Sequence, residues 1–203
     1  MTLLGDLTLS EIASRIGAML IFAFLQGLVL AGLARALGDR RPELEGRLSP
    51  NPFAQLSLWG MALGVLFTMG WVRPLHYDVS SNRLGGWGVL LVIVGGLGAM
   101  ALLVPAIDLL RPLALLLPRS GGYAVLYWLS QLQLLVAGAV ALNLLPIPGL
   151  VAGAIWQAVW PGQGRRLGRH EALGLAVVTV AVVAGLVPAL GPVVLPYLSL
   201  VGR

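Results

Sequence analysis

The sequence contains no cysteine and no lysine, and only two histidines in 203 residues. Without cysteine there can be no disulfide, no iron–sulfur cluster and no thiolate zinc site. All 13 basic residues are therefore arginines. They are scattered between apolar segments and form no basic patch with interleaved aromatic residues, which excludes a nucleic-acid surface and indicates membrane-topology signals instead.

Charge of either sign is scarce. Charged residues make up 10% of the chain, whereas a soluble domain carries about 25%. Hydrophobic residues make up 58%, and the mean hydropathy is +0.92. We therefore expect residues 1–203 to form one integral membrane domain. The first apolar run has no short apolar core followed by a small-residue cleavage site, so we expect it to be a mature helix and not a signal peptide.

A membrane-spanning helix needs about 20 apolar residues. The long apolar runs that predict such helices are Ile12–Leu37, Trp87–Leu110, Tyr123–Leu145 and Ala172–Leu195, the last with kinks at Pro188 and Pro192. Two shorter runs, Leu56–Val72 and Leu150–Trp160, are also candidates. We expect an all-α, polytopic bundle of about five to six transmembrane helices.

The arginines predict how the chain is oriented. If Leu150–Trp160 crosses the membrane, the loops Gly38–Gln55, Arg111–Gly122 and Pro161–Glu171 share one side. These loops contain eight arginines: Arg40, Arg41, Arg47, Arg111, Arg119, Arg165, Arg166 and Arg169. The positive-inside rule then places this side in the cytoplasm. If Tyr123–Trp160 is instead a single broken span, the last loop changes side.

Three motifs occur in order along the chain. They are Leu37–Asp39 followed by Gly46–Pro52, then Met69–Asp78, and finally Leu142–Gly153 with its Asn-Leu-Leu-Pro-Ile-Pro core. Together they resemble the prokaryotic site-2 protease family, whose members are intramembrane zinc proteases. The resemblance covers roughly Leu25–Ala158 and implies a site-2-protease-like helical bundle.

The same resemblance implies which residues would perform the chemistry. The family carries His-Glu-x-x-His on its first helix, where histidines at i and i+4 bind one zinc and the glutamate activates water. In this register, Gln26 and Leu30 replace the histidines and Gly27 replaces the glutamate. Val151 replaces the third ligand, an aspartate, and Ala99 replaces a family asparagine. We expect no catalytic residues, no metal and no cofactor.

Nothing else in the sequence restores a catalytic site. His76 and His170 lie 94 positions apart in different polar loops, and neither has a second ligand at metal-binding spacing. No serine lies in a Gly-x-Ser-x-Gly turn. The glycine-rich Val94–Ala101 lies inside an apolar run, where small residues more often allow close helix packing than nucleotide binding.

Two polar features remain as candidate binding residues. Gln26 and Asn143 lie in apolar runs, so they either form hydrogen bonds between helices or face each other across a remnant polar pocket. Arg165, Arg166 and Arg169 either anchor the topology or contact an anionic lipid headgroup.

The sequence thus predicts an inactive member of the family, a pseudoprotease, in a bacterial inner membrane. We expect it to be a multi-pass structural or binding subunit of a larger complex, with other integral membrane proteins and lipids as partners. One alternative is a regulator that binds a transmembrane substrate without cleaving it. Another is an intramembrane hydrolase with altered chemistry. A transporter is less favoured, because only one broken segment, Pro146–Pro148, is visible.

Overall fold

The computed structural model describes residues 8–160 and 164–200, with side chains for all of these except 164–169. The protein is all-helical, with 72% of residues in helices. Within the described ranges, the only β-type pairing is one isolated antiparallel bridge between Leu56 and Val72. The predicted all-α class is therefore confirmed.

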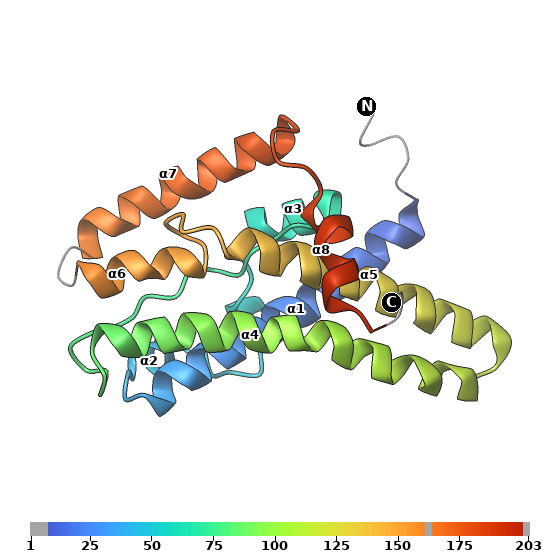
Figure 1. Cartoon of the computed structure of the whole chain (residues 1–203), viewed down its shortest axis with the longest axis horizontal. Coiled ribbons are helices and arrows are strands. Elements are labelled where there is room, and N and C mark those ends of the chain that lie inside the picture. The colour runs from blue at the N-terminus through green and yellow to red at the C-terminus, as the bar shows by residue number, and fades with distance from the viewer. Residues whose placement is uncertain (1–7, 161–163, 201–203) are drawn as a thin grey trace.

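Among the described residues, three helices are long and apolar enough to cross a membrane. They are α1 (Leu9–Ala36), α4 (Gly86–Leu110) with its 3-10 continuation η2 (Arg111–Leu116), and α5 (Arg119–Asn143) (Figure 1). Each agrees with a predicted run to within about one helical turn at either end. These helices support the assignment to the membrane-protein class, whereas the larger number of predicted spans is not confirmed.

The remaining elements are short or border the three long helices. They are α2 (Arg41–Leu44), η1 (Pro52–Ala54), α3 (Leu58–Phe67), η3 (Ala152–Ala154), α6 (Ile155–Val159), α7 (Gly164–Val183) and α8 (Leu190–Leu198). The main core lies where α1, α4 and α5 meet, around fully buried apolar side chains such as Phe22, Val92 and Leu135.

Local signals explain where α1 begins and ends. The Thr8 hydroxyl accepts a hydrogen bond from the Glu11 amide and so caps the first turn. At the other end, Gly38 has φ +102°, a left-handed conformation that glycine adopts at little cost. The helix therefore stops at the Leu-Gly-Asp turn, and Asp39 leads into the following loop.

The short candidate run Leu56–Val72 does not form one helix of membrane-spanning length. Helix α3 has only ten residues, and it ends at Thr68 in a left-handed conformation with φ +57°. The chain then turns back, and Gly70 packs closely against the backbone of Gly60. Buried re-entrant segments are as apolar as spans, which is why composition did not distinguish them.

The turn after α3 brings two polar loops to the same end of the molecule. The Arg73 amide donates to the Gln55 carbonyl, and the Asp78 amide donates to the Asp39 carboxylate, both at 2.8 Å. We call this region the loop end. It is formed by residues 37–57 and 70–85 and the adjoining turn 144–154.

The last apolar run also differs from its prediction. Helix α7 begins at Gly164, inside the predicted polar loop, and ends at Val183. A turn at Gly185, with φ +72°, separates it from α8. The predicted single kinked span over Ala172–Leu195 is therefore two helices, because Gly185 and Pro188 break the helix where only kinks were expected.

Helices α5 and α6 together run antiparallel to α4 (Figure 1). The contact of Gly86 with Ala158 places the end of α6 beside the start of α4. The chain from Tyr123 to Trp160 therefore runs from one end of the molecule toward the other, and the Arg111–Gly122 loop lies at the opposite end from Gly38–Gln55 (Figure 1). Of the two arrangements that the sequence left open, the structure therefore resembles the single broken Tyr123–Trp160 run, with the Arg111–Gly122 loop apart from the other arginine-rich segments.

Candidate functional site

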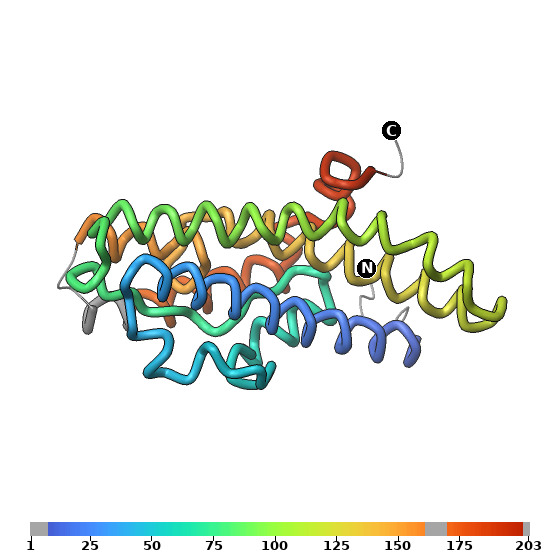
Figure 2. The backbone as a smooth tube through the Cα atoms, turned by 90° about the horizontal axis from the view of Figure 1, so that it is seen from below, coloured from blue at the N-terminus to red at the C-terminus, as the bar shows by residue number. Residues whose placement is uncertain are grey.

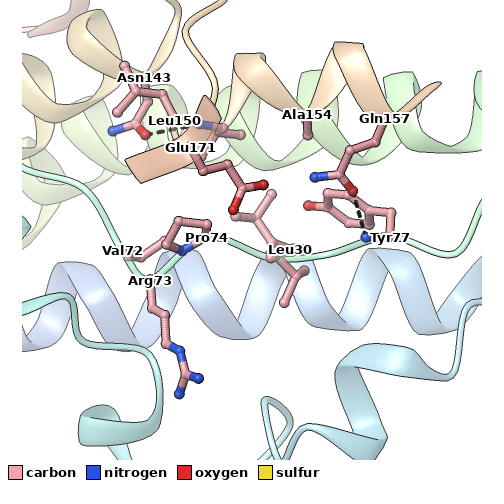
Figure 3. A pocket seen from close by; sticks show the side chains of 13 residues that line it. Leu30, Val72, Arg73, Pro74, Tyr77, Asn143, Leu150, Ala154, Gln157 and Glu171 are labelled. Carbon is pink, nitrogen blue, oxygen red and sulfur yellow. Dashed lines mark hydrogen bonds between the residues drawn. The ribbon is translucent and has the colours of Figure 1, made fainter. Parts of the chain in front are cut away.

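Two of the three motif segments, Met69–Asp78 and Leu142–Gly153, meet α1 around a small cavity of about 20 Å³, which is room for about one water molecule. Leu30 of α1 lines one wall, and the extended segment Val72–Tyr77 lines another (Figure 3). The turn Gly149–Ala154, Gln157 of α6 and Glu171 of α7 complete the cavity. The structure therefore brings together segments that are far apart in the sequence.

Gly27 lies at the position expected for a catalytic glutamate. The side chain of Gln55 occupies the space that a side chain at position 27 would need. A Cβ atom built on Gly27 would overlap the Cδ and Oε1 atoms of Gln55. Gln55 is itself fully buried and donates a hydrogen bond to the Arg47 carbonyl. No side chain fits at position 27 while Gln55 stays in place.

Arg47 fixes Gln55 and the extended segment together. Its guanidinium donates to Gln55 Oε1 at 3.1 Å and to the Ala54 carbonyl at 2.9 Å. It also donates to the carbonyls of Arg73 at 3.3 Å and Pro74 at 2.8 Å. Burial, and to a lesser degree the nearby charge of Arg73, lower the pKa of Arg47 from its usual value. Its many acceptors keep this arginine in place despite the cost of burial.

Leu30 and Val151, at the two other positions expected for metal ligands, both line the cavity with apolar side chains. Leu30 packs against Gly96 of α4 so closely that a Cβ on this glycine would overlap the leucine. The Val151 amide donates to Asn143 Oδ1 at 3.3 Å. The cavity is therefore filled from several sides by side chains that cannot bind a metal.

The two predicted polar residues behave differently. Asn143 donates to the carbonyls of Gly70 at 3.0 Å and Ala139 at 2.8 Å and accepts from Val151, so it connects α5 to two turns. Gln26 is equally buried, but its amide has no hydrogen-bond partner among the described residues. Asn143 lines the cavity and Gln26 does not, and no hydrogen bond joins the two.

One hydrogen-bonded pair lies beside the cavity. His76 Nε2 lies 3.1 Å from Glu171 Oε2, which joins the extended segment to α7 across 95 positions. The hydrogen bond with Glu171 raises the pKa of His76, against an opposing effect of burial. Burial, followed by the charge of Asp39, also raises the pKa of Tyr77, whose amide donates to Gln157 Oε1 at 2.9 Å.

The described residues contain no group of three or more His, Cys, Asp or Glu side chains that could hold a metal ion. His76 and Glu171 provide two such side chains at most. Arg165, Arg166 and Arg169 lie in the first turns of α7, and their side chains are outside the described part of the chain. Their predicted lipid contact stays a prediction.

Several important residues were not identified from the sequence. Arg47, Gln55, Gln157 and the His76–Glu171 pair carry no local signal, because their partners are 7 to 95 positions away. The glycine at position 27 was a hint, since a glycine in a buried helix often marks a close approach by another group. No family model, curated protein or solved structure matches the chain.

Proposed function

We propose that this chain is a non-catalytic, site-2-protease-like membrane protein that serves as a structural or binding subunit of a larger membrane complex. The observation that carries the proposal is Gln55, whose side chain fills the space beside Gly27. A lost glutamate alone would leave an empty or flexible site. Here Gln55, Leu30 and Val151 pack the region and leave space for about one water molecule.

The distribution of arginines supports a cytoplasmic loop end. Nine arginines lie at or beside that end of the bundle: Arg35, Arg40, Arg41, Arg47, Arg73, Arg83, Arg165, Arg166 and Arg169. Three described arginines, Arg15, Arg111 and Arg119, lie toward the opposite end. The positive-inside rule then favours a multi-pass protein of a bacterial inner membrane, with its loop end in the cytoplasm.

Two measurements test this proposal. Metal analysis of the protein purified in mild detergent should give well under one zinc per chain, and stoichiometric zinc would contradict the non-catalytic assignment. Size-exclusion chromatography of the tagged chain should give a complex with stoichiometric partner proteins. A lone monomer under the same conditions would contradict the subunit assignment.

A groove between α3 and α7 favours a second candidate, a regulator that binds a transmembrane segment without cleaving it. The groove has a volume of about 510 Å³ and is lined mainly by apolar or small residues: Ser57, Trp59, Ala172, Leu175, Ala176, Thr179 and Val180. Small residues on α7 allow close approach of another helix. Under this candidate, Ala176→Leu should reduce the yield of a cross-linked transmembrane partner, whereas Gly32→Leu, which meets open space, should not.

A further inference from the structure

The hairpin formed by α4, η2 and α5 extends beyond the other helices at the end opposite the loop end (Figures 1 and 2). Its last part has large apolar side chains on its surface. We call this part the apolar tip, and it consists of six exposed side chains: Leu113, Leu115, Leu116, Leu117, Tyr123 and Tyr127. Leu115 and Leu116 are 77% and 81% exposed.

Two polar clusters mark a level in the bundle just before the tip. In one, Arg15 pairs with Glu11 and donates to Gln131 at 3.2 Å. In the other, Arg111 pairs with Asp108 at 3.1 Å, and Gln133 donates to Asp108 at 2.7 Å. Because Gln131 and Gln133 are near neighbours on α5, the two clusters lie at the same depth.

A second polar level lies at the other end of α1. Arg35 there pairs with Glu43, and Asp39 holds the adjoining loops. Arg15 and Arg35 are 20 residues apart on one helix, which corresponds to about 30 Å. That is about the thickness of the hydrocarbon core of a bilayer. The two polar levels are therefore spaced as the two membrane surfaces are.

This spacing leaves the apolar tip outside the hydrocarbon. Along α5, Gln133 and Arg119 are 14 residues apart, or about 21 Å. The headgroup layer accounts for only about 5–7 Å of that distance. If the bilayer instead reached the tip, the Arg15–Glu11 and Arg111–Asp108 pairs would lie at the depth of the hydrocarbon core, which is costly for charged side chains.

The charges at the tip indicate what kind of surface would cover it. Residues 109–128 contain no acidic side chain, and their only charged residues are Arg111, paired with Asp108, and the exposed Arg119. A second copy of the chain would bring one Arg119 toward another, which is unfavourable. An exposed apolar patch bordered by a positive charge fits an apolar groove with an acidic edge.

We propose that the apolar tip docks into an apolar, acidic-edged groove on a different protein outside the membrane, on the side opposite the loop end. This inference rests on the proposed role as a complex subunit and specifies which surface makes the contact. The leucines of the tip supply the apolar area that is buried in the contact. Arg119 pairs with the acidic edge of the groove and so orients the tip in it.

The natural absence of cysteine allows a direct depth measurement by single-cysteine labelling. A spin label at Leu116→Cys, in the purified chain reconstituted into vesicles, should collide with a water-soluble nickel chelate. The same label at Leu102→Cys, an exposed α4 position between the two polar levels, should collide with oxygen and not with the chelate. If both sites behave alike as lipid-exposed, the tip lies in the bilayer and the proposal is wrong.

Photo-cross-linking in native membranes then identifies what covers the tip. A cysteine-linked photo-cross-linker at Leu116→Cys should capture a different protein, and Arg119→Glu should lower the yield at least about fivefold. Leu44→Cys, exposed at the loop end, is the matched control and should not capture the same protein. Capture of lipid alone, or of a second copy of this chain, would overturn the proposal.

A partner-binding experiment separates this inference from the proposed function. The double variant Leu115→Glu with Leu116→Glu should lose at least about tenfold of the partner co-purified by the wild type, whereas Leu44→Glu should retain it. Unchanged helicity and elution volume of the double variant, measured without the partner, would show that it is folded. If a folded double variant retains all of the partner, the proposed docking surface is wrong but the proposed function still stands. If the wild type co-purifies with no partner, the proposed function is wrong as well.

Discussion

The loop end and the opposite end, formed by the hairpin of α4, η2 and α5, satisfy the hydrogen-bonding groups of their backbones in different ways. At the loop end, segments without regular structure cross one another, and buried side chains such as Arg47 and Asn143 hydrogen-bond to their backbone groups. At the hairpin end, η2 and α5 satisfy their own backbones as helices, and large side chains face outward. Non-helical backbone near a membrane needs internal hydrogen-bond partners. The backbone at the loop end therefore depends on individual polar side chains, whereas the helical backbone of η2 and α5 does not.

The largest expected effect comes from replacing an arginine at each end by methionine. Arg47→Met leaves four acceptors at the loop end unpaired and should lower the free energy of unfolding by about 3–5 kcal/mol. Arg119→Met, at the exposed hairpin end, should change it by less than about 0.5 kcal/mol. Unfolding in mixed detergent micelles, followed by circular dichroism, measures both. Equal losses of unfolding free energy for the two variants would mean that the loop end depends on its arginine no more than the hairpin end does.

A second test compares the two buried amides of the predicted polar pair. Asn143→Leu leaves the Val151 amide and the Gly70 carbonyl without a partner and should cost about 2–3 kcal/mol. Gln26→Leu removes an amide that has no partner among the described residues, so it should be neutral or stabilise the protein by about 1 kcal/mol. The same unfolding assay applies. A loss at Gln26 as large as that at Asn143 would reveal a partner for the Gln26 amide.

The filled position at Gly27 gives a third test, with two glycines on one helix. Gly27→Ala collides with Gln55 and should cost about 2 kcal/mol, whereas Gly32→Ala meets open space and should stabilise α1 by about 0.5–1 kcal/mol. Combining Gly27→Ala with Gln55→Ala should cost at least about 1 kcal/mol less than the sum of the two single changes. Strict additivity would show that Gln55 does not fill the position.

The long helices could be predicted from the sequence, because about 20 apolar residues in a row have few other structures available. The short ones could not. Leu56–Val72 is as apolar as a span, but Thr68 and Gly70 reverse the chain inside the protein. The arginines before Glu171 indicated a loop, whereas the helix α7 already includes them. Arginine is a good helix former, so charge alone does not end a helix.

The candidate site was only partly predictable for a related reason. The resemblance placed Gln26, Gly27, Leu30 and Val151 at the site positions, and of these only Leu30 and Val151 line the cavity. Asn143 also lines it, whereas Gln26, its predicted partner across a polar pocket, does not. Gln55 and Glu171 reach the region through tertiary contacts 28 or more positions away, which no local pattern records. A missing ligand can be read from a sequence, whereas the side chain that fills its space cannot.

The smallest expected effect is a pH dependence of the His76–Glu171 pair. Glu171 and Glu45 favour the protonated histidine and Arg41 opposes it, with the net effect that the pKa of His76 is raised. The pair therefore contributes its full stability below the unfolded pKa of about 6.5, and loses it as the pH rises through the higher folded value. Because His76 is 45% exposed, this contribution should be only about 0.5 kcal/mol.

The measurement compares thermal unfolding of the wild type and His76→Gln at pH 5.5 and pH 8.5. The wild type should be the more stable of the two at pH 5.5, and the difference should disappear at pH 8.5. His170→Gln, which removes the exposed histidine, is the matched control and should follow the wild type at both values. A difference that persists unchanged at pH 8.5 would mean that His76 joins the loop end to α7 by packing or neutral hydrogen bonding and not through its charge.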